Sequence, residues 1–196
     1  VLFFGGNGLK LNHCRNGDEF MSVAIITDSN SGIFEKEAKE NGIFVVPMPI
    51  IIEGKTYFEG IDIELDKFLE LQEAGKDIST SQPAPASVMG TWDKALEEYD
   101  EVVYLPMTSG LSGSCATAMA FSQDYDGKVQ VVDNHRISVT LKVSVYQALE
   151  LSKKGYSART IKEILEKEGA FAVRADRACR RPSSFSPRHR QKWPGM

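Results

Sequence analysis

The sequence predicts an α/β domain built on a mainly parallel sheet with helices on both faces. Short apolar runs alternate along the chain with segments of helical length, and turn residues separate them. The first such run, Val23–Thr27, is apolar up to its last residue, which is typical of a strand buried on both faces. Strands that alternate with helices form parallel sheets, because each crossover helix returns the chain to the same end of the sheet and the next strand runs in the same direction.

The element boundaries follow from caps and breakers. Ser31 is expected to cap the first helix and Gly42 to end it, while Pro47 and Pro49 indicate an edge position or a bulge in the second strand. Glu53-Gly54-Lys55 predicts a turn. The predicted strands are 23–27, 43–52, 56–58, 101–106 and 128–133. The predicted helices are 32–41, a segment from 62 or 66 to 74, 86–99, one after 114, 138–154 and 157–168.

Composition places the chain among globular proteins. Of its 196 residues, 42% are hydrophobic and 26% charged, and no apolar run approaches the roughly 18 residues of a membrane span. Residues 21–172 carry 14 Lys and Arg against 24 Asp and Glu. This acidic balance argues against general nucleic-acid binding. The lack of a long apolar run argues against stable membrane insertion.

The two ends of the chain differ from its centre. Residues 1–20 show no periodicity, and Met21 opens the strong pattern, so we interpret 1–20 as a leader that is disordered or not native. Residues 173–196 hold six of the nine arginines, and we interpret them as a frame-shifted or disordered basic tail. The alternative is a basic arm for nucleic acid or a membrane. The predicted domain is therefore 21–172.

Cysteine and histidine usage indicates neither disulfides nor a metal site. Cys14, Cys115 and Cys179 are far apart and odd in number, which fits a reducing cytoplasm, and no zinc-ligand spacing occurs. Asp28 and Asp133 end predicted strands, where single carboxylates more often hold a loop than bind a metal. The sequence thus predicts no metal and no cofactor.

Three hydroxyl-rich loops lie where ligands bind in such folds, beyond the carboxyl ends of strands. They are residues 27–31, 79–85 and 108–114, and none contains Lys or Arg. The third precedes a helix of small residues, whose amino terminus offers backbone N–H groups to an anion. Neutral donors favour a weakly charged anion such as a carboxylate over a polyphosphate.

Taken together, the motifs resemble those of a known family. From Met21 to about Glu168 the chain is similar to the amino-terminal half of the DegV family, the bacterial fatty-acid-binding proteins. The order and spacing of the matching motifs agree over roughly 150 residues, which makes the resemblance specific. The matching segments are Ile25–Gly32, Asn41–Ile63, Ser79–Pro85, Ser109–Ala118 and Val129–Ser138.

The resemblance implies a cytoplasmic, monomeric carrier that is not itself an enzyme. It would bury a long-chain fatty acid in an apolar tunnel and present it to a fatty acid kinase for phospholipid synthesis. Carried over by motif, Thr80 and Ser112 would hold the fatty-acid carboxylate. The further candidates are Ser81, Ser109 and Gly113, with Ser29 weaker.

The chain departs from the family pattern in several places. Ser114 stands where the family has Thr and Cys115 where it has Tyr or a similar residue. Asp133-Asn134 stands where Asp-Ser is usual. The resemblance implies a second α/β domain after Phe171, and we expect this chain to lack it, because residues 172–196 do not resemble the family's later segment. If both domains close the tunnel, the resemblance implies that this chain does not bind a fatty acid by itself.

A phosphotransfer protein acting on small hydroxyketones is the alternative of another class. It would need a phosphate-accepting or covalent histidine, and His135, after a predicted strand, is the internal candidate. Phosphorylation at His135 or a co-purifying lipid would separate the two hypotheses.

Overall fold

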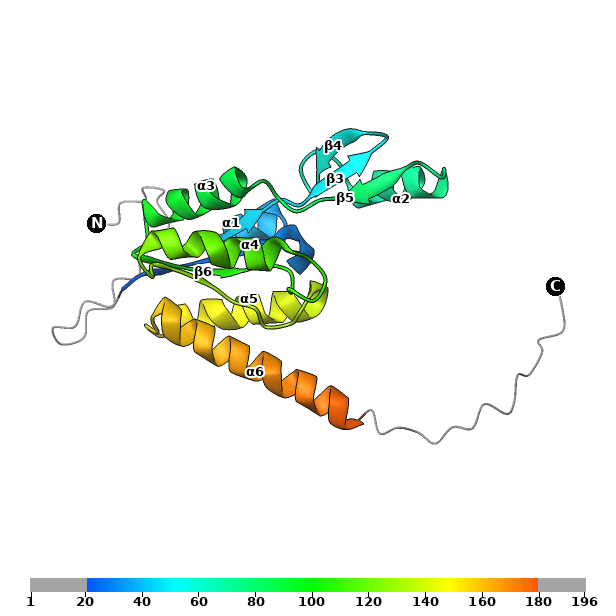
Figure 1. Cartoon of the computed structure of the whole chain (residues 1–196). Coiled ribbons are helices and arrows are strands. Elements are labelled where there is room, and N and C mark those ends of the chain that lie inside the picture. Colours follow the sequence, from blue (N-terminus) through cyan, green and yellow to red (C-terminus); the bar gives the residue numbers. More distant parts are fainter. Residues whose placement is uncertain (1–20, 180–196) are drawn as a thin grey trace, which may run out of the picture.

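A four-stranded parallel sheet forms the centre of the molecule. The computed structural model describes residues 21–179, with side chains to residue 169, and the expectations for the leader and for residues 180–196 lie outside it. The strands follow the order β2 (Ile43–Val46), β1 (Val23–Asp28), β6 (Glu101–Leu105) and β7 (Val129–Val131) (Figure 1). Ile25 of β1 lies opposite Ile43 and Val103, so the parallel α/β prediction is confirmed.

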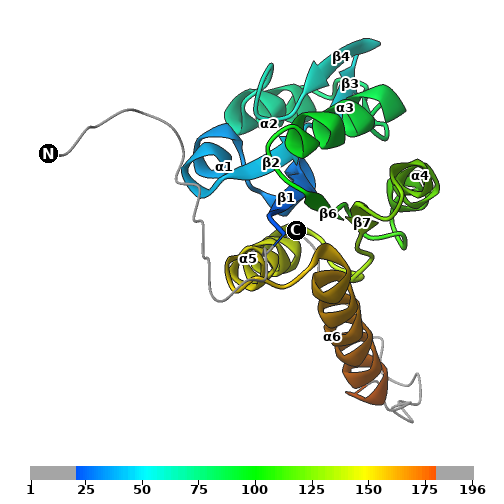
Figure 2. The ribbon, with the colours of Figure 1, turned by 90° about the vertical axis from the view of Figure 1, so that its left-hand side faces the viewer.

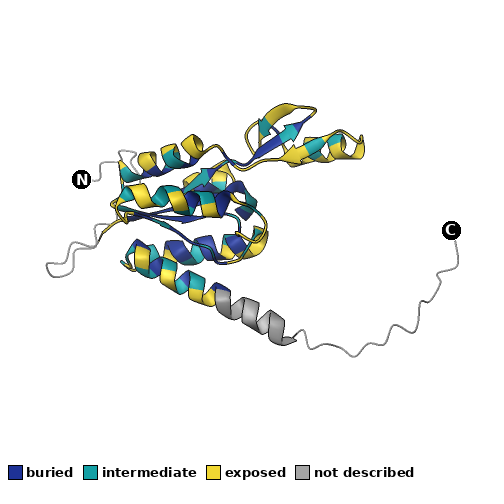
Figure 3. Ribbon diagram, viewed as in Figure 1, coloured by how far each residue is buried: buried dark blue, intermediate teal, exposed yellow. Residues whose placement is uncertain are grey.

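Helices cover both faces of this sheet (Figure 2). One face packs against α1 (Glu35–Asn41), α5 (Ser138–Lys153) and α6 (Ala158–Cys179). The other packs against α3 (Pro85–Leu96) and α4 (Ser114–Phe121), which a short 3-10 helix, η2 (Ser122–Tyr125), follows. Buried residues concentrate on the helix faces that meet the sheet (Figure 3). No helix in the described part of the chain combines the length and apolar character needed to cross a bilayer.

A small antiparallel sheet stands beside the carboxyl ends of the parallel strands. It contains β4 (Lys55–Phe58), β3 (Pro49–Ile52) and β5 (Ile78–Thr80), in that order, and α2 (Leu65–Glu73) packs on it. The prediction of a single strand over residues 43–52 is therefore wrong. It is two strands in two sheets, because Pro47 lacks the N–H that would continue the first ladder. Strand β5 was not predicted.

The first helix begins later than predicted. Ser31 does not cap a helix at 32. It closes a 3-10 turn, η1 (Ser29–Ser31), in which its hydroxyl donates to the Asp28 carbonyl at 2.8 Å and accepts from the Ile33 N–H at 3.3 Å. Helix α1 starts at Glu35. Gly42 follows its last residue and adopts a left-handed backbone conformation (φ 68°), so it ends the helix as predicted.

The last helix is longer than predicted, since α6 continues to Cys179 rather than ending near 168. The expected domain boundary between 172 and 173 thus falls inside a helix. Gly169 of α6 is buried directly against the backbone of Asn134, in the segment after β7. An added Cβ would clash with the Asn134 carbonyl oxygen, so this close approach requires glycine.

Gly169→Ala is expected to lower the free energy of unfolding by about 1–3 kcal/mol, because α6 must shift away from Asn134. Gly90→Ala in α3 is the matched control, since a Cβ there meets nothing within 4 Å. That change should stabilise the protein by up to about 1 kcal/mol through helix propensity. Urea unfolding of both variants measures the difference. Equal stabilisation by both would contradict the close contact.

Candidate functional site

Asp28 ties the segment after β1 to the segment after β6. Its carboxylate accepts the Asn30 N–H at 3.1 Å and the Met107 N–H at 2.7 Å. Burial raises the pKa of this carboxyl to about 6, although the bond from Met107 opposes the shift. The expectation that Asp28 holds a loop is confirmed.

Ser29 lies beneath the surface and its hydroxyl is already engaged. It donates to Glu59 Oε2 at 2.6 Å and accepts the Met48 N–H at 3.1 Å. The side chain thus joins the parallel sheet to the small sheet, and its hydroxyl proton is already used, so it has none to donate to a ligand.

The loop after β6 is folded around Thr108. Its side-chain oxygen accepts the Gly110 N–H at 3.2 Å, and its carbonyl accepts the N–H groups of Leu111 and Ser112. Ser112 in turn accepts the Ser114 N–H at the start of α4, at 3.2 Å. Its own hydroxyl proton makes no hydrogen bond within residues 21–169, so it remains able to donate to an anion.

The predicted hydroxyls of the second loop follow a strand of the small sheet, not of the parallel one. Thr80 ends β5 and Ser81 follows it; both are exposed, and their hydroxyls make no hydrogen bond within residues 21–169. The Ser81 N–H binds the Pro49 carbonyl at 3.3 Å. Next along the chain, Gln82 reaches the third loop. Its Oε1 lies 3.7 Å from the point where a Cβ atom would stand if Gly113 carried a side chain.

The second and third loops therefore meet at Gln82 and Gly113. Beneath this contact lies a cavity of about 10 Å³, bounded by Gln82, Tyr104 and Ser114 among others, with room for about one water. The Ser114 hydroxyl is buried and has no partner within the described residues. A space this small cannot hold an acyl chain, so such a chain would need other surface.

Apolar side chains are exposed at the same end of the sheet. Leu111 sits inside the third loop, and Val139 and Val143 lie on the first turns of α5. Their exposed fractions are 67%, 71% and 56%.

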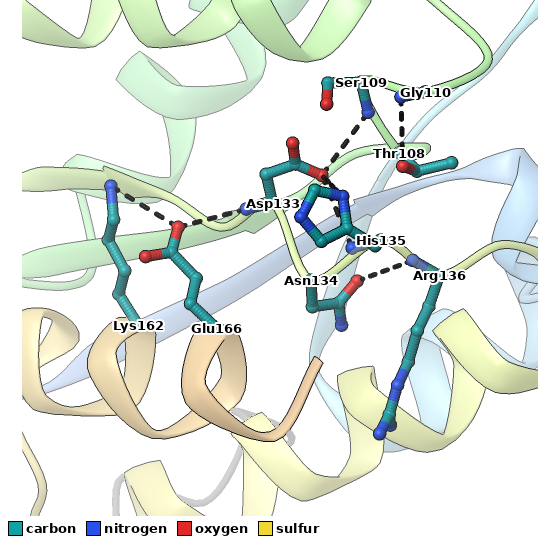
Figure 4. A network of polar contacts seen from close by, with 9 residues as sticks. All are labelled: Thr108, Ser109, Gly110, Asp133, Asn134, His135, Arg136, Lys162 and Glu166. Carbon is teal, nitrogen blue, oxygen red and sulfur yellow. Dashed lines mark hydrogen bonds and ion pairs between the residues drawn. The ribbon is translucent and has the colours of Figure 1, made fainter. Parts of the chain in front are cut away.

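The segment after β7 also belongs to this region, and sequence reasoning did not place it there (Figure 4). The Asp133 carboxylate accepts the N–H of Ser109 at 3.3 Å and that of His135 at 3.4 Å. Ser109 is thereby fixed by its backbone, while its exposed hydroxyl makes no bond within residues 21–169. His135 is half exposed, with Nδ1 3.6 Å from the same Asp133 oxygen. Asp133 thus holds a loop, as its position at a strand end suggested.

Comparison with known proteins identifies the family. The profile of the DegV family, described as uncharacterised proteins, matches residues 22–169. The chain belongs to the DegV family. A DegV domain-containing protein of Deinococcus radiodurans is 37% identical over 148 residues, which are 75% of this chain and 53% of that protein.

Solved DegV structures share the fold. A DegV family protein of Thermus thermophilus, described as binding fatty acid, is 29% identical with a TM-score of 0.70, and the match covers 76% of this chain and 54% of that one. DegV of Bacillus subtilis, described as a fatty acid binding protein, is 25% identical with a TM-score of 0.69 and the same coverage. The chain spans about half the length of the relatives it matches.

Both of these solved relatives are described as binding fatty acid, and neither description names phosphotransfer. Among the described residues, no group of three or more His, Cys, Asp or Glu side chains could hold a metal ion.

Proposed function

We propose that the chain binds a long-chain fatty acid and holds its carboxylate with the hydroxyls of Thr80 and Ser112. The observation that carries this is the meeting of the two loops at Gln82 and Gly113, with neither hydroxyl proton used in a bond among residues 21–169. Ser81 and Ser109 offer further donors at the rim, and the Gly113 backbone adjoins the start of α4. The fatty-acid-binding relatives support the choice of ligand.

The energetics suit neutral donors. A chain of about 16 carbons gains over 10 kcal/mol from burial, at roughly 0.8 kcal/mol per methylene, before ordering costs. The carboxylate then needs orientation more than added strength. Leu111 lies next to Ser112 in the third loop and is exposed, so part of the acyl chain can rest on it.

The wider role we propose is that of a carrier and not an enzyme. A monomeric cytoplasmic protein would present the bound carboxylate to a fatty acid kinase, which would make an acyl phosphate for phospholipid synthesis. Hydroxyl donors fit this role because they hold a carboxylate without the strong ion pair that would hinder its transfer.

Palmitate titration of the lipid-free chain tests the site. Combining Thr80→Val with Ser112→Ala should weaken binding at least tenfold, since a hydrogen bond to a charged group contributes about 1.5–3 kcal/mol. Thr56→Val on β4 makes the same exchange on the neighbouring part of the small sheet and should leave affinity unchanged. Methyl palmitate, which lacks the carboxylate charge, should bind the wild type and the double variant alike. An unchanged palmitate affinity in the double variant would refute the assigned site.

A further inference from the structure

Helix α6 is joined to the Ser109 loop by a continuous chain of contacts (Figure 4). Glu166 on α6 accepts the Asp133 N–H through Oε1 at 3.2 Å. The Asp133 carboxylate then accepts the Ser109 N–H at 3.3 Å. Two hydrogen bonds therefore connect a helix on one face of the sheet with a loop that leads to a helix on the other.

Asp133, in the middle of this series of contacts, is held tightly. The Asp133 side chain is only 14% exposed, and the same carboxylate oxygen also accepts the His135 N–H. His135 adopts a left-handed conformation (φ 57°), which folds the segment back over the carboxylate. Asp133 is thus fixed by its neighbours and has little freedom to follow Ser109 on its own.

The other end of this series of contacts, on α6, is equally constrained. Lys162 lies 3.8 Å from Glu166 Oε1, one turn earlier on the helix, and keeps the carboxylate directed at the Asp133 N–H. Three residues beyond Glu166, Gly169 contacts the Asn134 backbone without space for a methyl group. A shift of α6 would therefore move the segment after β7 with it.

We propose that Asp133 and Glu166 are positioning residues of the carboxylate site, so that the seating of α6 sets the placement of the Ser109–Gly113 loop. This inference rests on the proposed function. Neither residue contacts the ligand; each acts through a backbone N–H. Coupling of this kind runs through a chain of contacts that has a defined arrangement.

Amide NMR of the nitrogen-15-labelled chain, with palmitate titration, tests the coupling. Glu166→Ala should shift the Ser109 amide resonance, although the two residues do not touch, and should weaken palmitate binding about threefold to tenfold. Glu166→Gln keeps an acceptor oxygen and should restore both values. Glu163→Ala is the matched control, because Glu163 pairs with Arg159 on the exposed side of the same helix; it should change neither.

Asp133→Asn is a second variant for the case in which Glu166→Ala does not fold. It preserves the side-chain volume. Glu166 accepts a single N–H, but the Asp133 oxygen accepts those of both Ser109 and His135. A neutral amide oxygen holds two donors more weakly than a carboxylate, so the Ser109 resonance should shift and affinity should fall. A Ser109 amide that stays in place in a folded Glu166→Ala or Asp133→Asn variant overturns the proposal, and so does a shifted amide with unchanged affinity.

A wild-type chain that binds no palmitate would instead reject the proposed function. The Ser109 amide would still decide the coupling: a shift in Glu166→Ala that Glu166→Gln reverses supports it, and an unmoved amide refutes it.

Discussion

Replacing Trp92 with alanine is expected to lower the free energy of unfolding by about 3–5 kcal/mol, the range for truncating a large buried aromatic residue. Trp92 on α3 is fully buried, with its ring centroid 5.6 Å from that of Tyr104 and 5.4 Å from that of Tyr125, both in edge-on geometry. It therefore joins α3, strand β6 and the segment after α4. Thermal unfolding should show a midpoint lower by about 10 °C.

Trp92→Phe is the informative control. The Trp92 Nε1 is buried without a hydrogen-bond partner among the described residues, so phenylalanine gives up volume but no hydrogen bond. Its cost should be about 1–2 kcal/mol. A cost equal to that of alanine would show that the indole N–H has a partner in solution, contrary to this packing.

Stability should also depend on pH through Asp28. Its pKa is about 6 in the folded protein, raised by burial, against 3.8 for an ordinary aspartate. Between these values the folded state binds more protons than the unfolded state. The contribution is therefore fully present below about pH 4 and is lost as the pH rises through about 6, by about 3 kcal/mol in total.

Urea unfolding of the wild type and of Asp28→Asn, from pH 4 to pH 7, isolates this effect. The asparagine keeps a side-chain acceptor and cannot titrate, so the difference between the two proteins should follow the Asp28 titration. Asp100→Asn provides a control that should stay nearly flat over this pH range. Bonds from the Ser22 N–H and hydroxyl lower the pKa of Asp100 from its ordinary 3.8, so its stabilisation is lost only as the pH falls below that value. A wild-type minus Asp28→Asn difference that is flat with pH would contradict the raised pKa of this buried carboxyl.

The parallel sheet could be predicted because its strands are buried on both faces. All six positions of Val23–Asp28 are buried, and such a run has a strong apolar signal. Strand β5 gave no such signal, since it has three residues and two of them, Ser79 and Thr80, are exposed. The break at Pro47 was visible in the sequence, but the chain's passage into a second sheet depends on tertiary packing.

The candidate site could be predicted only in part, because some of its features are local in the sequence and others are not. Hydroxyl-rich loops at strand ends are a local pattern, and the structure brings the second and third loops together at Gln82 and Gly113. Long-range bonds have no local pattern. The Asp133 bond to Ser109 spans 24 residues, and the Asp28 bond to Met107 spans 79. A single sequence showed that these carboxylates end strands, but not which N–H groups they hold.

The most direct test of the fatty-acid site is a measurement of lipid bound to the purified protein. The chain is expressed in bacteria, shown to be folded, denatured and extracted, and the extract is quantified for fatty acids by mass spectrometry. We expect about one long-chain fatty acid per chain in the wild type, and its loss when Thr80→Val and Ser112→Ala are combined. A folded wild-type chain without fatty acid, or equal amounts in the double variant, would contradict the proposed carrier site.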